Sequence, residues 1–90
     1  FSEQDARSGD EFRVRVGLFQ MLDFEARAAI LDAREHHLRT RLEKLNVVET
    51  NFRLDHYAQE VTSQFQKETQ LELDWIERLR RGEKSGKHKQ

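Results

Sequence analysis

The 90-residue sequence contains no cysteine and no proline, and it has only four glycines. The lack of cysteine excludes disulfides and thiolate metal sites and leaves the redox compartment open. The lack of proline removes the strongest helix breaker. No apolar run is long enough to span a membrane and no signal-peptide pattern opens the chain, so we expect no membrane insertion and an intracellular location.

Charged residues make up 37% of the chain and hydrophobic residues 36%. Such a chain has too little apolar surface to build a thick core, but it can bury one apolar stripe of a helix against another helix. The sequence begins at Phe1 rather than at methionine, and we expect a segment of a larger protein. The fold class predicted is all-α, as a long coiled coil that forms a homodimer.

Helix start and stop signals bracket one long stretch. Ser8 and Glu11 form a capping box, and Gly82 suits the residue that follows a helix. We therefore predict a frayed N-terminus over residues 1–10, a coiled-coil helix over 11–81 and a disordered basic tail over 82–90. Residues 12–18 alternate apolar and polar like a strand, but a lone strand has nothing to pair with, so a helix is favoured.

Large apolar residues recur with a heptad pattern, which is typical of a coiled-coil seam. The predicted dimer seam comprises Val14, Met21, Phe24, Ala28, Leu31, Leu38, Leu42, Leu45, Phe52, Leu54, Ala58, Val61, Phe65, Trp75 and Leu79. Gly17, Glu35, Glu49, Glu68 and Glu72 interrupt it. The stripe changes register near residues 46–51, which indicates either a discontinuity in one helix or a helical hairpin. Whether the helices run parallel or antiparallel stays open.

Charge is distributed unevenly. Residues 47–77 carry seven acidic and two basic side chains, whereas residues 78–90 carry six basic and one acidic. A basic tail after a helix suits a polyanionic partner. The residues expected to bind it are Arg78, Arg80, Arg81, Lys84, Lys87 and Lys89. Nucleic acid is disfavoured as that partner, because the basic residues are few and no aromatic residue is interleaved with them.

No arrangement of residues points to an enzyme, a cofactor site or a metal site. His36 and His37 are adjacent, so on a helix they point about 100° apart, and no histidine belongs to a metal-binding motif. No glycine-rich phosphate loop or catalytic triad spacing is present. We therefore predict no catalytic, cofactor-binding or metal-binding residues.

The layout of a long imperfect coiled coil from about Glu11 to Arg81, followed by the basic tail, resembles microtubule-binding segments of cytoskeletal and kinetochore proteins. It is similar to the microtubule-binding region of a kinetoplastid kinetochore protein. The resemblance implies a structural coiled coil that binds microtubules electrostatically, in the cytoskeleton or in the nucleus at the kinetochore. The acidic block 47–77 confines the expected contact to the tail and the basic stretch Arg27–Lys44.

The alternative function is a protein–protein adaptor or tether. In that case the coiled coil presents a groove to a partner, the tail is inert, and no filament is bound. Phe12, Phe19 and Tyr57 lie off the predicted seam and would be the partner contacts. The two functions differ in their dependence on salt, because contacts between exposed charges are screened at high ionic strength.

Overall fold

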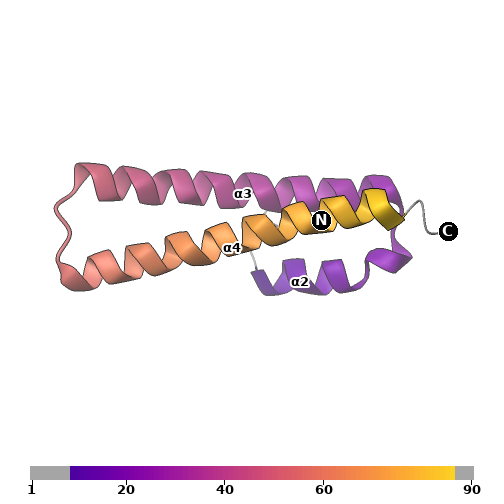
Figure 1. The fold of residues 1–90 in the computed structure, drawn as a ribbon, viewed down its shortest axis with the longest axis horizontal. Helices are drawn as coiled ribbons and strands as arrows, with labels where there is room; N and C mark the ends of the chain where they lie inside the picture. Colours follow the sequence, from indigo (N-terminus) through magenta and orange to yellow (C-terminus); the bar gives the residue numbers. More distant parts are fainter. Residues whose placement is uncertain (1–8, 87–90) are drawn as a thin grey trace. The chain divides into compact units, whose positions relative to one another are not determined.

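The computed structural model describes residues 9–86, with side chains through residue 82, and Figure 1 shows it as a ribbon. Its elements are α2 (Gly9–Gly17), the short 3-10 helix η1 (Phe19–Met21), α3 (Phe24–Asn51) and α4 (His56–Gly86). No strand occurs among these residues, which confirms the all-α prediction. The chain divides into two compact units, with the boundary between Thr40 and Arg41 inside α3.

The prediction of one helix over residues 11–81 is wrong, because the chain leaves the helix at residues 18–23 and again at 52–55. The first helix also begins at Gly9, inside the stretch expected to be frayed. Ser8, the expected N-cap, lies outside the described residues. Residues 12–17 are helical, so the helix favoured over the strand in this stretch is confirmed.

The first interruption follows a glycine. α2 ends at Gly17, whose cost in a helix is about 1 kcal/mol relative to alanine. The chain then tightens: the Leu18 amide donates to the Arg15 carbonyl at 3.0 Å, and the Met21 amide donates to the Leu18 carbonyl at 2.9 Å. Leu22 is extended, with φ −114° and ψ 149°, and this conformation ends the helical path before α3.

An aspartate caps the start of each long helix in the same way. Asp23 Oδ1 accepts the Ala26 amide at 2.8 Å, and Asp55 Oδ1 accepts the Ala58 amide at 2.8 Å. An N-cap aspartate satisfies an amide that has no partner within the helix and suits the positive end of the helix dipole. Residues 22–26 (LDFEA) and 54–58 (LDHYA) therefore encode two helix starts, and the second one fixes where α4 begins.

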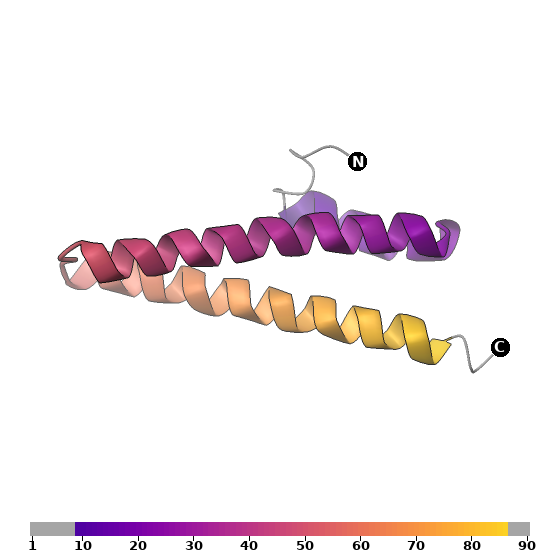
Figure 2. The ribbon, with the colours of Figure 1, turned by 90° about the horizontal axis from the view of Figure 1, so that it is seen from above.

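The second interruption produces a helical hairpin within residues 41–86. The Asn51 side-chain amide donates to the Val47 carbonyl at 3.1 Å as α3 ends. After four residues α4 runs back, and Gln66 Nε2 donates to Asn46 Oδ1 at 3.0 Å across the hairpin. Figures 1 and 2 show the end of α3 and the start of α4 side by side. The hairpin alternative is thus the one adopted, with its turn at 52–55.

α4 does not end at Gly82 but continues to Gly86, so the tail expected from residue 82 begins as helix. No described glycine has a positive φ, and Gly82 therefore does not adopt the left-handed conformation of a C′ residue. Glycine permits that conformation without enforcing it. The ion pair between Arg81 and Glu77, at 3.4 Å, is a contact along the helix that favours its continuation.

Candidate association surface

A cation–π contact joins α2 to α3 within the first unit. Phe12 is fully buried, and the Arg34 guanidinium carbon lies 5.7 Å from the centre of its ring. Arg34 is itself only 4% exposed. In the adaptor alternative Phe12 would contact a partner, but its ring is enclosed within this unit.

Within its own unit, each of three arginines spaced seven residues apart makes a contact with an aromatic residue. These are Arg27, Arg34 and Arg41. Arg27 Nε donates to the Phe19 carbonyl at 2.7 Å. The Arg41 guanidinium carbon lies 4.7 Å from the centre of the Phe65 ring, across the hairpin. Arg34 is buried, and the other two are half-buried. Of the basic residues expected to act in Arg27–Lys44, Arg39 and Lys44 remain exposed, so only part of the charge of this stretch is at the surface.

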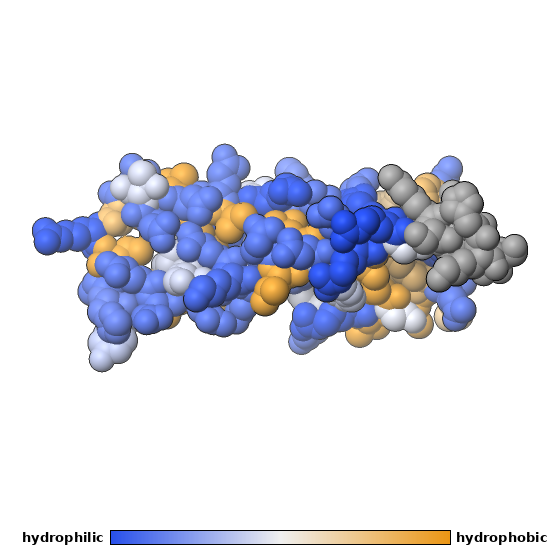
Figure 3. Space-filling view, in the orientation of Figure 1, coloured by the Kyte–Doolittle hydropathy of each residue, from blue (hydrophilic) through white to orange (hydrophobic). Residues whose placement is uncertain are grey.

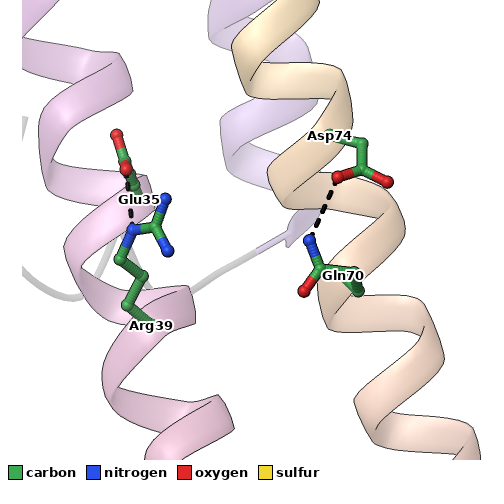
Figure 4. Close-up of polar contacts among 4 residues, drawn as sticks. All are labelled: Glu35, Arg39, Gln70 and Asp74. Carbon is green, nitrogen blue, oxygen red and sulfur yellow. Dashed lines mark hydrogen bonds and ion pairs between the residues drawn. The ribbon is translucent and has the colours of Figure 1, made fainter.

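Glu35, an acidic interruption of the predicted seam, is half-buried and pairs within α3. Its carboxylate lies 2.7 Å from Arg39 Nε, four residues later (Figure 4). This pairing compensates the charge of Glu35, so the residue is tolerated next to the buried positions. It also engages one of the exposed cations of the basic stretch.

The buried stripe of α4 lies one residue after the stripe predicted from the sequence. Its buried members are Thr62, Thr69, Leu73 and Ile76. Threonine is easily read as a surface residue, but Thr69 Oγ1 donates to the Phe65 carbonyl at 2.6 Å, so its hydroxyl is satisfied within the helix. A shift of one residue rotates the buried face by about 100°.

The predicted seam residues divide into three groups by exposure. Leu31 and Leu38 are buried. Those that are half-buried are Ala28, Leu42, Leu45, Leu54, Ala58, Trp75 and Leu79. Those that are exposed are Val14, Met21, Phe24, Phe52, Val61 and Phe65. These last six residues expose apolar surface in the single chain.

α4 carries a second heptad stripe that faces away from the buried one. We call it the outer stripe, and it consists of Tyr57, Val61, Gln64, Glu68, Leu71 and Trp75. The spacing of four and three residues alternates without a break, and the stripe lies about 140° around the helix from the buried stripe. Tyr57 is 79% exposed, Leu71 67% and Val61 54%.

The polar members near the middle of α4 are bonded along the helix. Gln64 Nε2 donates to Glu68 Oε2 at 3.1 Å, within the outer stripe. Beside the stripe, Gln70 Nε2 donates to Asp74 Oδ1 at 3.0 Å (Figure 4). Figure 3 shows that apolar side chains reach a largely polar surface on one face of the molecule. The outer stripe is thus an amphipathic surface with a preorganised polar centre.

The basic residues expected to bind a polyanion fall only partly within the described region. Arg78 and Arg81 are exposed, and Arg80 is half-buried. Lys84 belongs to α4, whereas Lys87 and Lys89 lie outside the described residues.

Within the described part of the chain, no group of three or more histidine, aspartate or glutamate residues is placed to hold a metal ion. In that same part no helix combines the length and the apolar character needed to cross a membrane. No protein-family model, curated protein or solved structure matches this chain.

Proposed function

We propose that this chain is a helical association module of a larger structural or scaffold protein, which forms a homodimer by coiled-coil packing of α4. The observation that carries the proposal is the outer stripe, a heptad series in which Tyr57, Val61 and Leu71 are each more than half exposed. The proposed role has no catalytic step and uses no cofactor.

The energetics of burial support the proposal. Fully burying a large apolar side chain contributes about 1.5–3 kcal/mol. Tyr57, Val61 and Leu71 are each more than half exposed, so a partner helix could gain from covering all three. Alternating spacing along 19 residues suits a partner that is itself a helix, because heptad positions align only with a second helix of similar period.

Two matched valine substitutions test this proposal. Val61→Gln removes an apolar residue of the outer stripe, whereas Val47→Gln removes one of nearly equal exposure, 50%, from α3. Sedimentation equilibrium should show a dimer for the unmodified chain and for Val47→Gln, with weaker association for Val61→Gln. A monomer at all concentrations would exclude the homodimer and favour the adaptor alternative, in which a different protein covers the outer stripe.

A second candidate function is electrostatic binding of microtubules through residues 78–90. The exposure of Arg78 and Arg81 at the basic end of α4 favours it. The tail would carry most of this contact, because in the Arg27–Lys44 stretch Arg34 is buried, Arg27 and Arg41 are half-buried, and only Arg39 and Lys44 are exposed. Dimerisation would double the number of tails and so raise the avidity.

Co-pelleting with microtubules tests the second function. The unmodified chain and a variant with Lys84, Lys87 and Lys89 replaced by Gln would be compared at low and at physiological salt. Pelleting that depends on these lysines and falls with salt supports the contact. Equal pelleting of both chains, or none at low salt, would exclude it.

A further inference from the structure

Four charged residues flank the outer stripe at heptad spacing. Glu60, Lys67, Asp74 and Arg81 lie seven residues apart, and all four are exposed. Their signs alternate along the helix: negative, positive, negative, positive. Neighbours in this row are about 10 Å apart along the axis, too far to pair directly with one another. We call these residues the charge row.

When two copies of the charge row run in opposite directions, each charge of one copy faces a charge of opposite sign in the other. Each residue of the charge row except Arg81 directly precedes a member of the outer stripe. The row therefore occupies a position that flanks the seam of a coiled coil, and charges at such positions set the choice and orientation of the partner helix. In an antiparallel pair this flank faces the same flank of the other helix. We propose that α4 binds α4 of a second copy in antiparallel orientation, with Glu60 opposite Arg81 and Lys67 opposite Asp74. This inference rests on the proposed function.

Two-fold symmetry doubles each of these contacts. Such a pair of helices makes four ion pairs, since Arg81 of the first copy also meets Glu60 of the second and Asp74 meets Lys67. Glu77 and Gln70 already hold Arg81 and Asp74 in place, at 3.4 Å and 3.0 Å. Partly fixed side chains lose less conformational freedom when they form a new contact.

The same register determines which residues face Gln64 and Glu68, the polar residues in the middle of the outer stripe. It places Glu68 opposite Leu71, Gln64 opposite Trp75 and Val61 opposite Arg78, so each of these layers pairs an apolar with a polar side chain and no layer holds two like charges. The Gln64 amide remains bonded to the Glu68 carboxylate at 3.1 Å and compensates part of its desolvation.

Other arrangements bring like charges together. A parallel pair in register would place Glu68 against Glu68. A shift of the antiparallel pair by one heptad would place Glu60 against Asp74 and Lys67 against itself. Like charges in facing positions are destabilising, and this repulsion opposes the shifted register even though that register would set Val61 against Leu71.

A charge exchange tests the proposed register. Lys67→Asp and Asp74→Lys should each weaken the dimer by about tenfold, because each creates two repulsive contacts. The double variant Lys67→Asp/Asp74→Lys restores opposite charges at both contacts and should recover the affinity of the unmodified chain. Sedimentation equilibrium gives the dissociation constants, and circular dichroism should show unchanged helix content, since both residues are exposed.

The outcomes separate this inference from the proposed function. A dimer in which the double variant is as weak as the single variants overturns the antiparallel register but leaves self-association intact. A monomeric unmodified chain overturns both. Because the chain has no cysteine, a second measurement is direct. A mixture of Glu68→Cys and Leu71→Cys chains should form mixed disulfides on oxidation, and preferential cross-linking of Glu68→Cys chains to each other would contradict the register.

Discussion

Arg34 and Phe12 are buried together, with the guanidinium carbon 5.7 Å from the ring centre, and this pair joins α2 to α3. A cation over a desolvated ring face contributes about 2 kcal/mol in favourable cases. The contact also explains why α2, only nine residues long, is held in place. A helix that short is marginal in isolation and depends on packing.

Phe12→Ala should destabilise the first unit by about 3–5 kcal/mol, because it removes a fully buried aromatic side chain. Val14→Ala is the control, since that residue lies on the same short helix but is exposed. Urea unfolding followed by circular dichroism would measure both. Equal small effects from the two substitutions would show that α2 does not pack through Phe12.

The two aspartate caps should each be worth about 1 kcal/mol. Asp23→Ala and Asp55→Ala each remove the acceptor of a 2.8 Å bond to an amide in the first turn of a helix. Asn retains an oxygen acceptor, so Asp23→Asn and Asp55→Asn should lose much less stability. Thermal unfolding would report the difference, and an alanine variant as stable as its asparagine counterpart would count against the cap.

Leu73 and Leu71 offer a direct test of which face of α4 is buried, because their exposed fractions are 6% and 67%. Leu73→Ala should lower the free energy of unfolding by about 2–5 kcal/mol, the usual cost of truncating a buried leucine. Leu71→Ala should change the stability of the monomer by no more than about 0.5 kcal/mol.

Urea unfolding at a concentration where the chain is monomeric would measure both leucine substitutions. Leu71→Ala should then reduce dimerisation at higher concentration, where Leu71 is covered. A large loss of monomer stability from Leu71→Ala would mean that the outer stripe is part of the core.

The contact between Arg41 and Phe65, at 4.7 Å across the hairpin, should contribute about 0.5–1 kcal/mol. A double-mutant cycle with Arg41→Met and Phe65→Leu would isolate it, since both substitutions keep an apolar side chain of similar reach. Strict additivity of the two single effects would indicate that the hairpin gains nothing from this pair.

Local signals in the sequence account for much of the secondary structure. The heptad spacing of Leu31 and Leu38 predicted positions that are buried. The change of register near residues 46–51 lies just before the turn at 52–55. The LDHYA segment held a further signal, because aspartate after an apolar residue is a common start of a helix. This signal marks the turn at 52–55, a few residues after the change of register in the apolar stripe.

The prediction of the buried face failed for a different reason. Thr62 and Thr69 look polar in the sequence, and arginines at 27, 34 and 41 look like surface residues. Yet a threonine can satisfy its hydroxyl on its own helix, as Thr69 does with the Phe65 carbonyl, and an arginine can place its apolar stem and guanidinium over a ring. Residue type alone does not reveal such pairings.

The sequence by itself determined that the chain is helical and where apolar side chains recur along it, because propensity and spacing act locally. Only the tertiary structure decided which of two adjacent stripes on α4 is buried. The stripe predicted from the sequence, which contains Val61, and the buried stripe, which contains Thr62, differ by one residue, or about 100° around the helix. Which one turns inward depends on the hairpin, where Arg41 covers Phe65 and Asn46 accepts a bond from Gln66. Such long-range contacts leave no mark in the local spacing of residues.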